Sequence, residues 1–254
     1  MRNVDLNHEK KRIISFIKDY MLSSGFSKGI IGISGGLDSS VVAALAVEAL
    51  GKEKVTGVMM PYKKSNPNSL NDALLLASKI AFNYRIIDIT PMVDSWFDNY
   101  EPEASKLRQG NYMARIRMTV LYDLSSKDNA LVIGTGNFSE LMTGYTTQYG
   151  DNACAFEPIG HLYKTEVRKL AKLLNIPSSI VDKHPSADLW KGQTDESELG
   201  ISYCVLDQIL HAFLEKKMSK EKMIESGFNS KDIDRVVDLY KKSEYKRNMP
   251  SCLK

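Results

Sequence analysis

The sequence predicts an α/β protein with a doubly wound parallel sheet of about five strands, helices on both faces and a helical C-terminal part. Two patterns predict this fold class. From residue 29 to beyond residue 137, short apolar runs of strand length alternate with segments of helical spacing. After residue 200 only helical stretches follow, and we expect three of them.

The predicted elements follow in order along the chain. An amphipathic helix comes first, because apolar residues recur near helical spacing from Ile13 to Met21, and it ends near Gly25. The apolar run GIIGI at 29–33 then predicts a buried strand. A turn of serines and glycines leads from this strand into an apolar helix, SSVVAALAVEAL at 39–50.

The same alternation continues through the middle of the chain. We expect strands at 54–60 and 84–89 with a helix at 68–81 between them, then a long helix at 104–124 and a fourth strand beginning at 131–133. Ligands of such sheets bind at the carboxyl ends of the strands. The turns that follow the first and fourth strands are therefore the first places to expect a site.

Beyond the sheet the pattern is less regular. Residues 144–160 are polar and loop-like, although AFEPI at 155–159 could form a short edge strand. A helix is expected at 164–174. The stretch 184–200 is polar and contains a proline and two glycines, and its apolar residues follow neither helical nor strand spacing. This pattern predicts a lid or a disordered segment. Without a repeat or a linker, residues 1–254 are expected to form one domain.

Composition excludes several classes of protein. A formal net charge of only +3 does not call for a nucleic acid partner. No apolar run approaches the roughly 20 residues that span a bilayer, and the charged N-terminus does not resemble a secretory signal. Cys154, Cys204 and Cys252 are odd in number and far apart, which argues against disulfides or a CxxC metal site and for the cytoplasm.

The turn after the first strand, SGGLDSS at 34–40, carries the strongest local signal. Two glycines let backbone amides approach a phosphate, and free N–H groups at the following helix start favour an anion, helped by three serine hydroxyls. The turn has no Walker lysine. Its Asp38 instead indicates a bridging divalent cation. The plainer alternative is an ordinary strand–turn–helix in which Ser and Asp cap the helix.

This turn resembles the pyrophosphatase loop of the ATP pyrophosphatases, enzymes that cleave ATP between the α and β phosphates and adenylate an oxygen of their substrate. The resemblance implies an ATP site made by Ile33, Ser34, Gly35, Gly36, Leu37, Asp38, Ser39 and Ser40. Four later segments resemble one branch of that superfamily, the NAD⁺ synthetases, at 110–117, 134–151, 158–168 and 185–196.

The resemblance implies roles for residues of the first two segments. Asn111 and Arg115 share a helix face, which would contact deamido-NAD⁺ near a dimer interface; a solvated polar stripe is the alternative. Thr135 would meet ATP, and Glu140 would share Mg²⁺ with Asp38. Asp151 would lie near the reacting carboxyl group, and we expect it to deprotonate ammonium as a catalytic base.

The remaining segments complete the expected site. Lys164 begins a helix, where a structural lysine opposes the dipole, so phosphate binding and catalysis are expected of it. Ser186 belongs to the stretch that resembles the family's ATP-covering loop. The tail at Tyr245, Lys246 and Arg247 resembles its substrate clamp, and we expect Tyr245, Lys246 and Gln148 to contact the substrate.

The chain departs from the family pattern at three of these places. Many relatives carry Lys where Gln148 stands and Asp where Ala155 stands, and His is usual where Tyr245 stands. Losing both members of an opposite-charge pair costs less than losing one. These departures concern how the substrate is held rather than the reaction.

The implied reaction is the ATP-dependent amidation of deamido-NAD⁺ by ammonia through an acyl adenylate, with Mg²⁺ as cofactor. No fused amidase domain is expected, and none of the three cysteines has a recognisable nucleophile setting. Alternatives are a GMP-forming synthetase subunit, a tRNA-modifying thiolase or a non-catalytic nucleotide-binding module. The cysteine spacing and small net charge disfavour the thiolase, and Asp38 with Glu140 disfavours the non-catalytic module.

A homodimer is also expected, with an interface around the helix from Asn111 to Tyr122. Along this helix apolar residues exceed what a solvated helix needs: Met113, Ile116, Val120 and Leu121. The alternative is that these residues pack into the core of their own chain.

Overall fold

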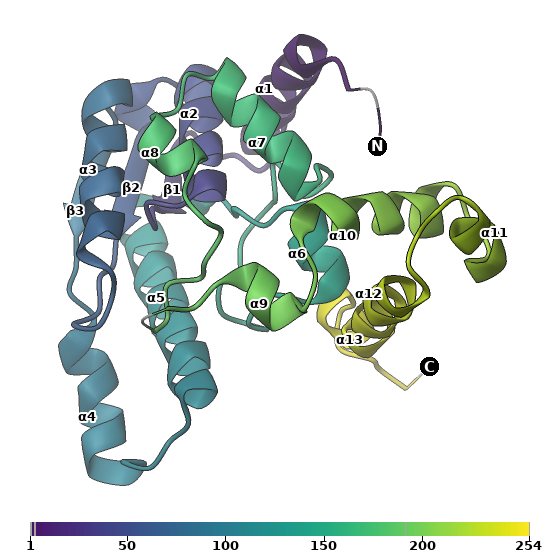
Figure 1. The fold of residues 1–254 in the computed structure, drawn as a ribbon. Coiled ribbons are helices and arrows are strands. Elements are labelled where there is room, and N and C mark those ends of the chain that lie inside the picture. Colours follow the sequence, from purple (N-terminus) through teal and green to yellow (C-terminus); the bar gives the residue numbers. More distant parts are fainter. Residues whose placement is uncertain (1, 3, 191, 254) are drawn as a thin grey trace.

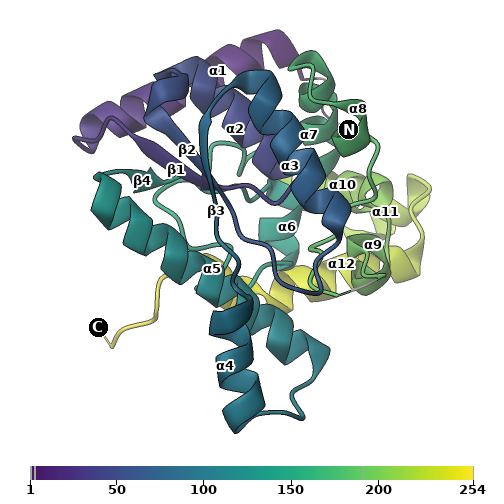
Figure 2. The ribbon, with the colours of Figure 1, turned by 90° about the vertical axis from the view of Figure 1, so that its left-hand side faces the viewer.

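The computed structural model describes residues 2, 4–190 and 192–253. Its centre is one parallel sheet with strand order β3-β2-β1-β4 (Figure 1 and, for β4, Figure 2). The strands are β1 (Gly29–Gly32), β2 (Val55–Met59), β3 (Asn83–Ile86) and β4 (Leu131–Val132). The doubly wound parallel fold predicted from the sequence is confirmed, with four strands in place of about five. The AFEPI segment adds a single bridge, between Phe156 and Ile133.

Helices surround this sheet and continue past it. Those that precede or follow strands are α1 (Leu6–Ser23), α2 (Leu37–Leu50), α3 (Pro67–Ile80), α4 (Thr90–Tyr100), α5 (Lys106–Asp128) and α7 (Lys164–Leu173). Shorter helices are η1 (Lys52–Lys54), α6 (Phe138–Thr143), α8 (Ser178–Val181) and α9 (Asp195–Leu199). The C-terminal part contains α10 (Tyr203–Leu210), the π-helical turn η2 (His211–Glu215), α11 (Lys220–Glu225), α12 (Ser230–Lys242) and α13 (Glu244–Arg247).

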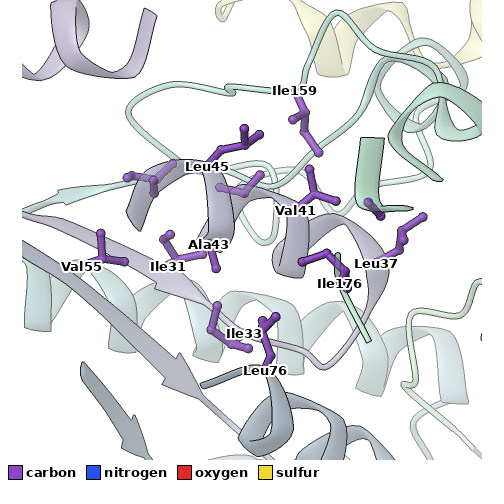
Figure 3. Packing of buried hydrophobic residues seen from close by; sticks show 14 of the residues in the cluster. Ile31, Ile33, Leu37, Val41, Ala43, Leu45, Val55, Leu76, Ile159 and Ile176 are labelled. Atoms are coloured by element: carbon purple, nitrogen blue, oxygen red, sulfur yellow. The ribbon is translucent and has the colours of Figure 1, made fainter. Parts of the chain in front are cut away.

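Alternate residues of each strand point to opposite faces of the sheet, so each face has its own core. Ile31 and Val55 pack with residues of α2 and α3, as Figure 3 shows, and α1 and α7 lie against α2. Ile30 and Val58 pack on the other face, which α5 covers (Figure 2). Both faces are buried, which explains why the central strands are apolar along their whole length.

The apolar stripe of α5 faces the core of its own chain. Met113 is 3% exposed, and Ile116, Val120 and Leu121 pack partly buried against the same cluster as Ile30. Met113 therefore belongs to the core of its own chain, whereas Ile116, Val120 and Leu121 remain partly exposed, and their place in a dimer surface stays a prediction. A helical pattern shows that one face is apolar, but it does not show which element covers that face.

A third apolar cluster joins the C-terminal helices to α6. Leu206, Leu210 and Val236 form its centre, and Phe138 and Met142 of α6 pack against it. This cluster places α10 and α12 beside the loops that follow the sheet (Figure 1). Among the residues that the structure describes, no helix has both the length and the apolar character that crossing a bilayer requires.

The strand order creates a switch point at the centre of the sheet. From β1 the chain moves outward to β2 and β3, and it then returns to the other side of β1 to form β4. The loops after β1 and β4 therefore leave the carboxyl edge of the sheet in diverging directions, and the space between them is where such folds bind ligands. Both loops carry residues that the sequence predicted to be functional.

Candidate active site

The turn after β1 is built by its glycines and serines. Gly35 has a φ of +74°, and a Cβ atom there would lie 2.0 Å from the carbonyl oxygen of Ser69, so only glycine fits. The Ser39 and Ser40 hydroxyls both donate to the Gly36 carbonyl. The hydroxyls expected to help bind an anion thus shape the turn in this structure. No side chain caps the start of α2, which leaves its backbone N–H groups for a ligand.

Three charged side chains meet at the switch point. The Lys164 Nζ atom donates to Asp38 Oδ2 at 2.6 Å and to Glu140 Oε1 at 2.8 Å. These residues come from the starts of α2, α6 and α7, and each is mostly buried. Asn137, in the loop after β4, donates to the other oxygen of Asp38 at 2.9 Å and so ties the two loops together. Among the residues predicted to hold metal and phosphate, these three are in direct contact.

Lys164 occupies an unfavourable place for a cation, and neighbouring acids compensate for it. Its side chain is 5% exposed at the first position of α7, where the helix dipole repels positive charge. Burial lowers the pKa of Lys164, but Asp38 and Glu140 outweigh burial and raise this pKa above its ordinary value. The lysine is therefore held charged in a site that a structural residue would avoid.

A second group of buried polar residues fixes the start of α7. The Lys164 amide donates to Ser139 Oγ, whose hydroxyl donates to Asp207, and the Thr165 amide donates to the other oxygen of Asp207. Asp207 is fully buried, and burial raises the pKa of its carboxyl group. This chain of hydrogen bonds sets the position of Lys164, and nothing in the local sequence of α7 predicts it.

The Asp38 and Glu140 carboxylates fit a magnesium ion by their chemistry. Mg²⁺ takes hard oxygen ligands and is commonly held by one or two carboxylates together with substrate phosphates. Burial and Asp38 raise the pKa of Glu140 and Lys164 lowers it, and together they bring it to about 7. A divalent cation would favour the charged form of both acids. Among the described residues, no group of three His, Cys, Asp or Glu side chains could hold a metal alone.

The predicted substrate residues form a separate group around the loop after α6. Arg115 donates through Nε and Nη2 to the backbone carbonyl of Gln148, at 3.3 and 3.2 Å. Asn111 accepts from the Thr147 hydroxyl, and the Thr147 amide donates to Asp151. Solvent reaches Asp151, yet the dense protein around it raises the pKa of its carboxyl group.

The C-terminal tail reaches the same loop. The Lys246 Nζ atom donates to the carbonyls of Gly144 and Thr146, both at 2.7 Å. Burial lowers the pKa of Lys246, although Asp151 raises it. Tyr245 points away into solvent and is 60% exposed, so only Lys246 of the predicted clamp contacts the loop.

The predicted lid is docked on the rest of the molecule. Asp188 accepts from the Asn66 amide and the Ser69 hydroxyl at the start of α3, next to the turn that contains Gly35. Ser186 is exposed and accepts from the Asp188 amide, while Thr135 lies at the carboxyl end of β4. The lid also contains the short helix α9, which the aperiodic sequence did not predict.

One partly buried acid in the site was not predicted from the sequence. Glu157 accepts from the Gly136 amide at 2.8 Å and from the Cys154 thiol. A Cβ atom on Gly134 would lie 2.4 Å from its carboxyl group, so the glycines after β4 make room for it. Burial raises the pKa of Glu157 to about 8. Glu157 thus supports the loop that carries Thr135.

We predict that Glu157→Gln removes a pH dependence of stability. Because the folded-state pKa lies near 8 and the ordinary value is 4.5, the folded protein binds this proton more tightly than the unfolded chain. The contribution of Glu157 to the free energy of unfolding therefore falls as pH rises between these two values, by about 1.4 kcal/mol for each pH unit. Urea unfolding from about pH 5 to about pH 9 should show the variant gaining stability relative to wild type. Parallel profiles would contradict this.

The fold and its central cluster place the chain among doubly wound α/β proteins with a ligand site at the switch point. The sequence profile of the NAD synthase family matches residues 9–250. The chain belongs to this family.

Three similar proteins extend the comparison. The NH(3)-dependent NAD(+) synthetase of Fusobacterium nucleatum is 48% identical over 256 residues, which covers 100% of this chain and 99% of that protein. The NH3-dependent NAD synthetase of Campylobacter jejuni, solved with nitrate, has a TM-score of 0.85 and 36% identity over 99% and 100% of the two chains. An NMN synthetase from Francisella tularensis has a TM-score of 0.89 and 31% identity over 99% of each.

Proposed function

We propose that the chain is an ammonia-dependent NAD⁺ synthetase that converts deamido-NAD⁺, ATP and ammonia into NAD⁺, AMP and pyrophosphate. Its relatives of 41–48% identity carry this name over nearly their full lengths. The observation that carries the proposal is the contact of Lys164 with both Asp38 and Glu140 at the switch point of an NAD synthase fold. The Lys164 ammonium group of this cluster can stabilise the negative charge that develops on phosphate when ATP is cleaved.

Activation of the carboxylate is the first step. A carboxylate resists ammonia, and its conversion to an acyl adenylate creates a good leaving group. One carboxylate oxygen attacks the α phosphorus of ATP, and the bond to the bridging oxygen of pyrophosphate breaks. We assign the backbone amides from Gly35 to Ser40, together with Lys164, to stabilising the charge that develops on pyrophosphate.

Asp38 and Glu140 would hold the magnesium ion. Their oxygens are the ligands that Mg²⁺ prefers. In proteins this ion is usually bound by one or two carboxylates together with substrate phosphates, which Asp38, Glu140 and ATP would supply. When bound, Mg²⁺ supplies neutralisation of phosphate charge. Lys164 then serves a second purpose, because its ammonium group lowers the pKa of Glu140.

Formation of the amide is the second step. Ammonia attacks the adenylate carbonyl carbon, the C–N bond forms, and AMP leaves with the electron pair of the C–O bond. We assign Asn111, Arg115 and Lys246 to holding deamido-NAD⁺ because they converge on the loop at 144–151, which also contains Gln148. We assign Thr135 and Ser186 to binding ATP.

We further propose that residues 1–254 act as one synthetase domain that takes ammonia directly. The three cysteines are unpaired, and burial together with Glu157 raises the pKa of Cys154, the opposite of what a nucleophilic thiol needs. Pure protein should form NAD⁺ from ATP and deamido-NAD⁺ with ammonium chloride, and none with glutamine. Turnover with glutamine as the only nitrogen source would contradict the proposal.

A second candidate substrate is the mononucleotide form of the same acid. The similarity to an NMN synthetase, with its TM-score of 0.89, favours testing it. The chemistry at the carboxyl group is identical, so the two substrates differ only in contacts to the adenylate half. Comparing kcat/KM for nicotinate mononucleotide and deamido-NAD⁺ decides between them, and we expect deamido-NAD⁺ to be preferred.

We propose a cytoplasmic homodimer. The exposed aromatic side chains of α4 and α5 support a dimer: Trp96 stacks on Tyr112, Tyr100 is 69% exposed and Tyr122 is 42% exposed. Tyr112 and Tyr122 belong to α5, which carries Asn111 and Arg115, and Trp96 and Tyr100 belong to the adjoining α4, so a second copy would sit near the substrate residues. Light scattering across a dilution series tests this, and a fully active monomer would contradict it.

A further inference from the structure

Asp195 brings an unused acceptor into the interior of the active site. It is the first residue of α9, and only 4% of its surface is exposed. Its Oδ2 atom accepts from the Tyr203 hydroxyl at 3.1 Å. Its Oδ1 atom is buried and has no hydrogen-bond partner among the residues that the structure describes. A buried carboxylate oxygen without a donor costs free energy, so Asp195 is suited to a ligand that donates.

The backbone holds Asp195 firmly in this position. Its amide donates to the Pro185 carbonyl at 3.0 Å, which joins the two ends of the lid. The cap of α9 is Thr194, whose hydroxyl accepts from the Ser197 amide. Capping therefore does not require the Asp195 side chain. Tyr203 is fixed in turn, because its amide donates to Glu196.

The surroundings of Asp195 contain more negative than positive charge. Burial raises the pKa of Asp195, Lys164 lowers it, and Asp38 raises it. Lys164 already donates to Asp38 and Glu140, so one lysine faces three acids. This excess of negative charge favours the binding of one more small cation.

Aromatic rings border the same place. The Tyr203 ring lies 5.2 Å from the Lys164 ammonium group, and the Tyr145 hydroxyl interacts with Asp195 while it donates to Glu198. A carboxylate beside aromatic rings is a setting that recognises ammonium groups. A metal ion fits less well, because the acids do not converge to hold one among the described residues. The proposed reaction consumes ammonia, which is present at neutral pH as the small cation ammonium.

We propose that Asp195 binds the ammonium ion through Oδ1 and accepts its proton, so that ammonia is released beside the acyl adenylate. This inference rests on the proposed function and names the group that handles the nitrogen substrate. The proton passes from NH₄⁺ to the carboxylate, which leaves neutral NH₃ with a free electron pair. That pair forms the C–N bond as AMP departs, and the amide nitrogen gives up one further proton to the AMP phosphate or to solvent. Asp151, the base expected from the sequence, is less suited, because it is exposed to solvent, whereas Asp195 is buried.

The test separates the nitrogen step from adenylation. Asp195→Asn keeps the size of the side chain and its bond from Tyr203, and it removes the charge. The KM for ammonium should rise at least about tenfold, which is the effect of one lost charged contact. Exchange of labelled pyrophosphate into ATP with deamido-NAD⁺, without ammonia, should stay within about twofold of wild type. Hydroxylamine, which is uncharged at neutral pH, should restore turnover.

Two matched variants complete the experiment. Asp182→Asn makes the same chemical change at an exposed acid that follows α8, outside the proposed site, and should leave the KM for ammonium unchanged. Asp151→Asn tests the rival base. A raised KM in Asp151→Asn but not in Asp195→Asn would overturn the proposal. So would loss of pyrophosphate exchange in Asp195→Asn, because Asp195 would then serve the lid or ATP. Wild-type protein without any exchange would instead contradict the proposed function.

Discussion

Replacing Asp38 by asparagine should lower the rate of pyrophosphate formation on the order of a thousandfold while leaving the fold intact. Asn keeps the shape of the side chain but removes the charge that would hold Mg²⁺ against the phosphates. Stability should change little, because Lys164 would still pair with Glu140, one cation with one anion. Pyrophosphate release with saturating ATP and deamido-NAD⁺ measures the loss.

The control for this variant is Asp234→Asn on α12, which makes the same chemical change in an exposed ion pair with Lys220. Its activity should equal that of the wild type, since exposed pairs contribute little. If Asp38→Asn kept more than about a tenth of wild-type activity, Asp38 would have no metal-ligand role.

Replacing Lys164 by methionine should damage both activity and stability. Methionine fills the buried space of the lysine stem, but it removes a phosphate contact, worth about 100- to 1,000-fold in rate. It also leaves Asp38 and Glu140 buried without a cation, which costs about 3–5 kcal/mol. The loss of stability should grow as pH rises, because without Lys164 the folded variant would hold a proton on Glu140 more tightly than the unfolded chain does.

Thermal unfolding at several pH values, together with pyrophosphate release, measures both effects. Lys172→Met, at the exposed end of the same helix, is the matched control and should behave like the wild type. Lys164→Met with normal stability at high pH would show that the two acids do not depend on Lys164 for their charge.

The sequence was sufficient for the parts of the fold whose patterns are local. The run at 29–33 and the turn after it predicted β1, the nucleotide turn and the start of α2, because burial and glycine use mark them directly. The helix α4 was not predicted, although Pro91 marks its first turn. The sequence also could not show which elements cover an apolar helix face: Met113 is buried in its own chain, whereas Val120 and Leu121 are only partly buried there.

In the candidate site, too, the sequence indicated individual residues but not the contacts between them. Asp38, Glu140 and Lys164 are each expected from the sequence to be functional, but their mutual contact joins residues up to 126 positions apart and depends on the strand order. Glu157 and Asp195 could not be singled out, because an acid in a polar loop is ordinarily solvated. Only burial distinguishes these two, and burial is a property of the folded chain.

The central claim is that the substrate carboxylate attacks the α phosphorus of ATP to form an acyl adenylate. Deamido-NAD⁺ labelled with ¹⁸O in its carboxyl group tests it most directly. After turnover with ATP and ammonium, mass spectrometry should find one labelled oxygen in the AMP and none in the pyrophosphate. The label should also appear in AMP at a rate that falls with Asp38→Asn. Unlabelled AMP, or ADP with labelled phosphate, would contradict the claim.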